Sequence, residues 1–208
     1  MSFKDFIDKI EHFKQKPLGG LEAQFKMAPK MRLKYDKGKI IANNPKKAAV
    51  LALFYPNKKN EITFLLTKRA SYKGTHSAQI SFPGGKLEKK DKNLQETAIR
   101  EAFEEVGTIP STIEIIRKLT DVYIPPSNFL VSPFLGFTNK KPYFTKNYEV
   151  AEIIEISLSD LLDDAYLSTV NLTTSYMKNI DVPCFKFDNQ IIWGATAMML
   201  SEIKELLK

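Results

Sequence analysis

The sequence predicts an α/β protein, and three observations lead to that fold class. Apolar residues gather in seven short runs that have the length and composition of β-strands. Residues 94–106 show helical periodicity with one apolar side, and residues 196–207 form a second helical run at the end of the chain. Strands interrupted by one helix and closed by another fit a sheet packed between helices.

The chain begins with a predicted helix. Ser2 and Asp5 have the spacing of a capping box, and apolar residues then recur at helical spacing until Pro17. These apolar residues are Phe3, Phe6, Ile7, Ile10 and Phe13. Such a face usually packs inside the molecule, but it can also contact a second subunit, as in a homodimer, or a membrane surface. Residues 17–45 are rich in Pro, Gly and Lys, so we expect 1–45 to form a helix and extension that wrap onto a main domain, 46–208.

Seven strands and three further helices are expected after this extension. The strands are bounded by turn residues, and they cover residues 48–55, 62–66, 78–82, 114–120, 130–137, 152–156 and 184–187. The helices cover residues 94–106, 158–165 and 196–207. The helix at 94–106 therefore falls between the third and fourth strands.

This helix carries three carboxylates close together. At ~100° per residue, its charged residues span an arc of roughly 140°, opposite an apolar side; they are Arg100, Glu101, Glu104 and Glu105. Like charges this close repel one another unless a cation lies among them, and carboxylate oxygens favour Mg²⁺ or Mn²⁺. A Glu-Glu pair by itself would be read as a solvated helix face, so the interpretation depends on the residues around it.

The segment before the helix adds candidate ligands. Pro83 followed by Gly84 and Gly85 predicts a sharp turn, and the carbonyl of Gly85 can complete a metal shell. Arg69 ends a strand-like run and offers a forked cation for phosphate oxygens, although a structural ion pair is an equal alternative. The other two candidates, His76 and Gln79, either bind substrate or hold the loop, and the loop role is favoured.

In this order the residues resemble the Nudix box. That pattern runs glycine, five residues, an acid, seven residues, then Arg-Glu-aliphatic-x-Glu-Glu-x-Gly, and it is matched by Gly85, Arg100, Glu101, Glu104, Glu105 and Gly107. Two positions depart from it. Asp91 stands eight residues before Arg100, which leaves Glu88 as a rival for the loop acid, and Ala102 replaces a larger aliphatic residue. The resemblance implies an α/β/α sandwich with a mixed β-sheet between helices.

The flanking segments resemble the coenzyme A pyrophosphatase branch of this family. Residues 65–69 are similar to its LLTxR motif and residues 76–85 to its HxGQxxFPGG motif, with Ala78 in place of a glycine. The resemblance implies a small nucleotide substrate, coenzyme A or its thioesters, cleaved to adenosine 3′,5′-bisphosphate and 4′-phosphopantetheine or its acyl form. Residues 123–129 are expected to line the substrate pocket. Alternatives are another nucleoside diphosphate derivative, such as ADP-ribose, or a binding module without catalysis.

The resemblance also implies roles for the site residues. The expected ligands of Mg²⁺ or Mn²⁺ are Glu101, Glu104, Glu105 and the carbonyl of Gly85. Arg100 is expected to orient Glu104 or a neighbouring carboxylate, because it stands four residues before it. The general base is either a glutamate of the box or a downstream acid, for which Glu149 and Glu152 are the candidates.

Composition limits the other classes of function. A net charge of +7 and a pI near 9.3 suit an anionic substrate or serve only solubility, and without an RNA-binding motif we expect no nucleic acid partner. Cys184 is the only cysteine and there are two histidines, which argues against a disulfide and a cysteine- or histidine-rich zinc site. No apolar run is long enough to span a membrane, so a cytoplasmic enzyme is expected.

Overall fold

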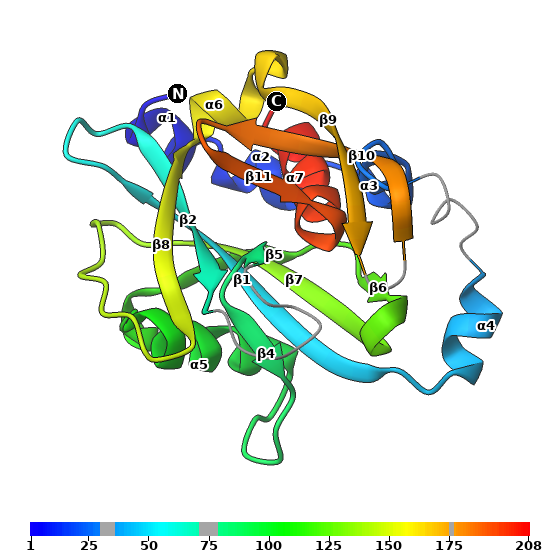
Figure 1. The fold of residues 1–208 in the computed structure, drawn as a ribbon. Helices are drawn as coiled ribbons and strands as arrows, with labels where there is room; N and C mark the ends of the chain where they lie inside the picture. Colours follow the sequence, from blue (N-terminus) through cyan, green and yellow to red (C-terminus); the bar gives the residue numbers. More distant parts are fainter. Residues whose placement is uncertain (30–35, 71–78, 175–176) are drawn as a thin grey trace.

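The computed structural model describes residues 1–29, 36–70, 79–174 and 177–208. At its centre is a mixed sheet of eight strands. Helix α5 (Leu94–Val106) covers one face of this sheet and helix α7 (Gly194–Leu207) lies over the other (Figure 1). The predicted α/β class, with a mixed sheet between helices, is therefore confirmed.

The central strand of the sheet is β1 (Lys46–Pro56). It runs parallel to β7 (Phe129–Phe137) and antiparallel to β2 (Ile62–Arg69). The remaining strands pair antiparallel to these three, and they are β3 (Ile80–Ser81), β4 (Gly84–Lys86), β5 (Glu114–Lys118), β6 (Val122–Ile124) and β8 (Val150–Ser157). The path is β3-β2-β1-β7-β5, with β4 on β1, β6 on β7 and β8 on β2.

Side chains of β1 alternate between two apolar cores. Ala49 and Leu51 belong to the cluster beneath α5, whereas Ala52 and Phe54 belong to the larger cluster on the side of α7. This alternation follows from the two-residue period of a strand. A residue's position along β1 or β2 therefore decides which of the two faces it reaches.

A second sheet of three strands lies beside α7. Its order is β11-β10-β9, formed by β9 (Leu167–Thr174), β10 (Met177–Phe187) and β11 (Gln190–Trp193), drawn in gold to orange in Figure 1. Only the last part of β10, the expected strand 184–187, is anticipated by the sequence. The shorter helical segments after residue 45 are α6 (Leu158–Leu162), η2 (Pro110–Thr112), η3 (Pro125–Ser127) and η4 (Asp164–Tyr166).

The N-terminal segment packs on the same core as the sheet. The expected first helix is two helices, α1 (Phe3–Asp8) and α2 (Ile10–Gln15), because the Lys9 N–H bonds back three residues to the Phe6 carbonyl at 3.2 Å and interrupts the α-helical pattern. The predicted capping box is present, with Asp5 N–H donating to Ser2 Oγ at 3.2 Å. The apolar face of these helices packs inside the chain.

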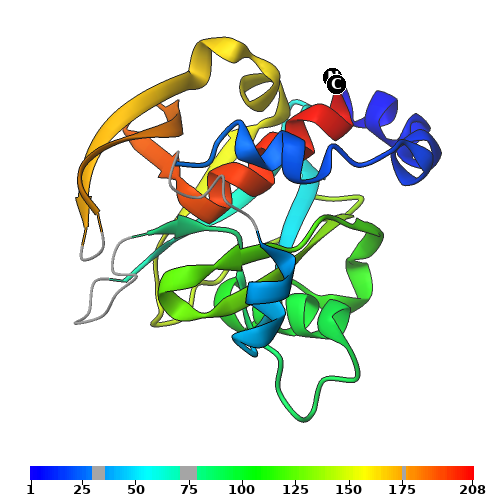
Figure 2. The ribbon, with the colours of Figure 1, turned by 90° about the vertical axis from the view of Figure 1, so that its right-hand side faces the viewer.

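The extension that follows is helical in part. It contains α3 (Gly20–Phe25), which contacts α7, and α4 (Lys37–Ala42). Figures 1 and 2 show the two chain termini side by side. None of the helices within the described ranges is long and apolar enough to cross a bilayer. Whether the chain divides at residue 45, and whether it forms a homodimer, stay predictions.

Candidate active site

Helix α5 holds the acidic residues at one face of the sheet. Its first turn is capped by Asn93, whose side chain accepts a hydrogen bond from the Glu96 N–H at 3.0 Å. Ala98, Ala102 and Val106 are fully buried and pack the helix against the sheet. The helix ends at Gly107, where φ is 74°, a left-handed conformation that favours glycine. The predicted bounds, 94–106, are confirmed.

Two glycines of β4 let the backbone lie against these acids. A Cβ atom on Gly85 would stand 2.3 Å from Glu101 Oε1, so any side chain there would displace the carboxylate. A Cβ on Gly84 would lie 2.3 Å from the Ala49 carbonyl oxygen. The Gly84 N–H donates to Glu105 Oε2 at 3.3 Å. The glycine turn and the acidic helix are thus in contact, as the sequence predicts.

Glu101 and Glu105 are carboxylates in a poorly solvated position. Glu105 is 8% exposed, and burial together with the charge of Glu101 raises its pKa to about 8. Burial also raises the pKa of Glu101, against the opposing effect of Arg100. The raised pKa values mean that the surroundings do not fully stabilise the negative charge of the two carboxylates. A cation between Glu101 and Glu105 would stabilise it.

Arg100 is the centre of an ion-pair network. Its guanidinium binds Asp91 through two hydrogen bonds, Nε to Oδ1 at 2.8 Å and Nη2 to Oδ2 at 3.0 Å. Nη1 donates to Glu101 Oε1 and to Glu104 Oε2, both at 2.9 Å, and Nη2 donates to the Lys86 carbonyl at 3.0 Å. Arg100 therefore joins the loop, the end of β4 and two of the helix acids.

The structure distinguishes the two candidates for the loop acid. The Asp91 side chain is 3% exposed, also accepts hydrogen bonds from the Glu88 N–H and Thr97 Oγ1, and has its pKa held well below the usual range by Arg100. Glu88 is half-exposed, with its carboxylate 3.9 Å from Arg100 Nη1 and 3.2 Å from Lys90 Nζ. Asp91 is the residue that binds Arg100 closely, although the spacing is one residue longer than the family pattern.

Glu104 lies at the outer side of the site. Its exposed carboxylate bonds to Arg100 and to Lys90 Nζ at 3.2 Å. Among the residues described by the structure, no three His, Cys, Asp or Glu groups already enclose a metal position. Glu101 and Glu105 lie against β4 and fit hard oxygen ligation together with the Gly85 carbonyl, whereas Glu104 is linked to them through Arg100.

Arg69 and Glu149 form a pair on the same side of the sheet as α5. Arg69 Nη2 lies 2.7 Å from Glu149 Oε2, and the charges of both residues act on Glu105. The Arg69 N–H donates to the Gln79 carbonyl at 3.0 Å, which joins β2 to the segment before β3. His76, the third residue expected to bind substrate, lies outside the described residues.

Glu152 is not brought to the acidic helix. It pairs with Lys68 of β2, their charged atoms 3.6 Å apart, and accepts a hydrogen bond from Gln190 of β11. Glu152 stands on the same face of β8 as Ile154 and Ile156, whose side chains join the core on the side of α7. The two-residue period of β8 therefore turns Glu152 away from α5, and of the two downstream acids it is Glu149 that reaches the site.

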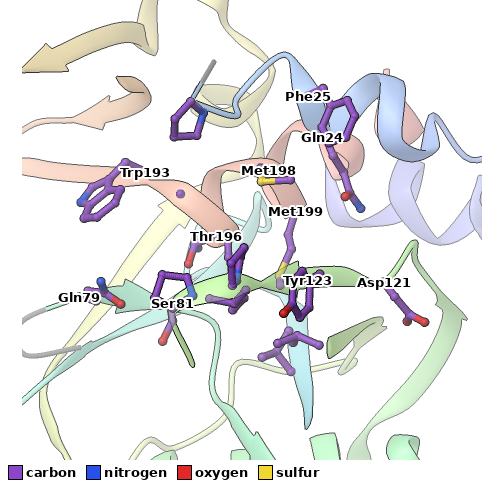
Figure 3. A pocket seen from close by; sticks show the side chains of 18 of the residues that line it. Gln24, Phe25, Gln79, Ser81, Asp121, Tyr123, Trp193, Thr196, Met198 and Met199 are labelled. Carbon is purple, nitrogen blue, oxygen red and sulfur yellow. The ribbon is translucent and has the colours of Figure 1, made fainter. Parts of the chain in front are cut away.

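A cavity of about 480 Å³ opens on the side of the sheet opposite α5 (Figure 3). Part of its wall comes from Tyr123, Ile124, Pro125 and Pro126, in the segment expected to line a pocket, and part from Gln79. Phe82 also lines the cavity, and Gly84, two residues further, contacts Glu105. The short β3–β4 segment thus contributes residues to both the cavity wall and the acidic site.

Comparison with known proteins agrees with this architecture. The NUDIX domain model matches residues 45–164. The uncharacterized Nudix hydrolase NudL of Yersinia pestis (strain Pestoides F) is 33% identical over 146 residues, which are 70% of this chain and 72% of that protein. A Nudix hydrolase from M. smegmatis, RenU, superposes with a TM-score of 0.55 at 15% identity, over 78% of this chain and 86% of its own. A MutT/nudix family protein from Enterococcus faecalis superposes with a TM-score of 0.52 at 12% identity, over 93% of this chain and 76% of its own. The two solved structures support the fold alone.

Proposed function

Because this chain belongs to the Nudix hydrolase family and is a pyrophosphohydrolase, we propose that its substrate is coenzyme A or a coenzyme A thioester. Hydrolysis of the phosphoanhydride would yield adenosine 3′,5′-bisphosphate and 4′-phosphopantetheine or its acyl form. Support for this substrate comes from residues 65–69 and 76–85, which resemble the coenzyme A branch of the family, and from the largely apolar cavity that shares the β3–β4 segment with the site.

One observation carries the catalytic part of the proposal. Two carboxylates with raised pKa values, Glu101 and Glu105, lie against the Gly84-Gly85 backbone. Nudix hydrolases generally use divalent metal ions, and Mg²⁺ or Mn²⁺ suits this set of carboxylate and carbonyl oxygens. When bound, such an ion neutralises the diphosphate and lowers the pKa of the attacking water.

The protein's own residues supply orientation and a proton acceptor. Glu101, Glu105 and the Gly85 carbonyl would hold the ion, and Arg100 positions Glu101 and Glu104 through its two 2.9 Å hydrogen bonds. Arg69 directs its guanidinium to this face, where a diphosphate oxygen would lie. Glu104 and Glu149 are the carboxylates on this side of the sheet that we propose as acceptors of the proton from water.

Substitution of the two buried acids tests the proposal. We expect Glu105→Gln and Glu101→Gln to lower kcat for coenzyme A by roughly a hundredfold or more, because each removes a charge that holds the ion. The products are resolved by chromatography after reaction in Mg²⁺ and in Mn²⁺. Glu96→Gln, on the exposed first turn of the same helix, is the matched control and should retain activity.

Two results would contradict the proposal. Full activity in both glutamine variants would remove the acidic helix from the mechanism. Much faster turnover of ADP-ribose than of coenzyme A would leave the hydrolase intact and reject the substrate.

A further inference from the structure

The cavity is built largely by segments outside the matched NUDIX domain. Helices α3 and α4 precede residue 45, and β11 and α7 follow residue 164. Figure 3 shows Phe25, Trp193, Met198 and Met199 around the cavity. Leu21 of α3 and Ile40 of α4 also line it. At about 480 Å³ it has the size of a site for part of a small molecule.

The described part of the wall offers little positive charge to a phosphate group. Within the described residues, the charged side chains of the wall are Asp36, Lys39 and Asp121. Lys39 Nζ lies 3.7 Å from the Asp36 carboxylate, and Asp121 is 2.7 Å from Lys118 Nζ. Among the described residues the cation of the wall is paired and the other two groups are acids, so this part of the wall offers an anion little compensating charge.

One polar group of the wall has an unused hydrogen-bonding capacity. Gln24 is fully buried on α3, and its Nε2 donates to the Thr120 carbonyl at 2.9 Å and to Glu202 at 3.0 Å. Its Oε1 atom accepts no hydrogen bond from any residue that the structure describes. Because this atom is fully buried, a ligand in the cavity would not reach it, and recognition there depends on the apolar side chains of the wall.

We propose that this cavity binds the pantetheine arm of the substrate, with its amide groups and the acyl chain of a thioester. The inference rests on the proposed function, since it places the diphosphate at Glu101 and Glu105. It assigns the charged 3′-phosphoadenosine end to a position outside the cavity. Phe82 lines the cavity and the Gly84 N–H bonds to Glu105, so the segment from Phe82 to Gly84 belongs to both sites, and the proposal places one substrate across it.

The chain offers an internal probe for this site. Trp193 is the only tryptophan, and it lies in the cavity wall. We expect S-hexanoyl-pantetheine, which has no phosphoanhydride, to change its fluorescence in a saturable manner in the full-length protein. Ala195→Phe, which fills the cavity, and Ile40→Ala, which removes part of its wall, should weaken this binding roughly tenfold or more.

A matched control and a kinetic readout separate recognition from folding. Ile41 neighbours Ile40 on α4 but is 66% exposed, so Ile41→Ala should bind as the wild type does. With hexanoyl-coenzyme A, Ala195→Phe should raise KM and leave kcat little changed, because the reacting atoms lie elsewhere. Circular dichroism checks that each variant is folded.

Each outcome decides a different statement. Saturable binding that is lost in Ala195→Phe supports the cavity as the site of the pantetheine arm. If coenzyme A is then not hydrolysed, only the proposed function is rejected. No fluorescence response in the wild type overturns the inference. A fall of kcat with an unchanged KM in Ala195→Phe would also overturn the inference. Hydrolysis of coenzyme A by the wild type would in that case still support the proposed function.

Discussion

At the residue scale, a single arginine connects the parts of the site. Arg100 is largely buried and bonds Asp91, Glu101, Glu104 and a backbone carbonyl. The bidentate bond to Asp91 uses the planar fork of the guanidinium, which lysine could not reproduce. Asp91 fixes the position of Arg100, and Arg100 contacts Glu101 directly. The loop acid therefore helps to determine where Glu101, a candidate metal ligand, lies. Asp91 is thus a positioning residue.

We predict that Asp91→Asn lowers both stability and activity. It removes the charge that compensates Arg100, so the free energy of unfolding should fall by about 1.5–3 kcal/mol. Denaturant unfolding measures this change. Glu88→Gln, in the same loop but half-exposed, should alter stability by less than about 0.5 kcal/mol. A larger effect of Glu88→Gln than of Asp91→Asn would reverse the assignment of the loop acid.

At the element scale, α7 is the helix to which the extension is attached. Its fully buried Glu202 accepts hydrogen bonds from the Gly20 N–H, the Gln24 amide, and the N–H and hydroxyl of Thr120. One carboxylate thereby joins α3, α7 and the connection between β5 and β6. These three elements also bound the cavity, so the shape of the cavity depends on this carboxylate.

We expect Glu202→Ala to destabilise the protein by on the order of 3 kcal/mol, because it leaves several buried donors without an acceptor. Hydrogen exchange should show α3 losing protection before the strands of the central sheet. The control is Glu205→Ala on the same helix, which removes only a partly exposed pair with Lys26 and should cost at most about 1 kcal/mol. Equal losses in the two variants would contradict the role of Glu202.

At the scale of the whole molecule, the first helices complete the main core. Phe6 is fully buried, and its ring centroid lies 5.6 Å from that of Phe13, 5.7 Å from that of Phe54 and 6.3 Å from that of Phe137. Phe54 and Phe137 belong to β1 and β7, the parallel pair at the centre of the sheet. The N-terminal segment is therefore part of the packing that stabilises the sheet.

We predict that Phe6→Ala lowers the free energy of unfolding by about 3–5 kcal/mol, since it leaves a cavity among aromatic rings. Thermal or denaturant unfolding of the full chain provides the measurement. Exposed Ile41→Ala should stay within about 0.5 kcal/mol of the wild type. A small effect of Phe6→Ala would mean that the first helices contribute little to the stability of the domain.

The sequence by itself predicts the elements whose signals are local. Helix α5 has a capping residue, an apolar stripe and a terminal glycine, and its bounds follow from them. The long strands β1, β2 and β7 are apolar runs because both of their faces are covered. By contrast, β9 is rich in Ser, Thr and Asn at the edge of a small sheet, so no alternation of buried residues marks it.

What only the tertiary structure decides is which distant residues meet. The sequence indicates the acids of α5 and the glycine turn, because both lie in one short segment. It could not choose between Glu149 and Glu152, since the choice depends on the face to which β8 turns each side chain. It also could not assemble the cavity, whose wall joins α3 to α7, residues nearly a whole chain apart. Such contacts depend on packing between elements, and spacing along the chain carries no record of them.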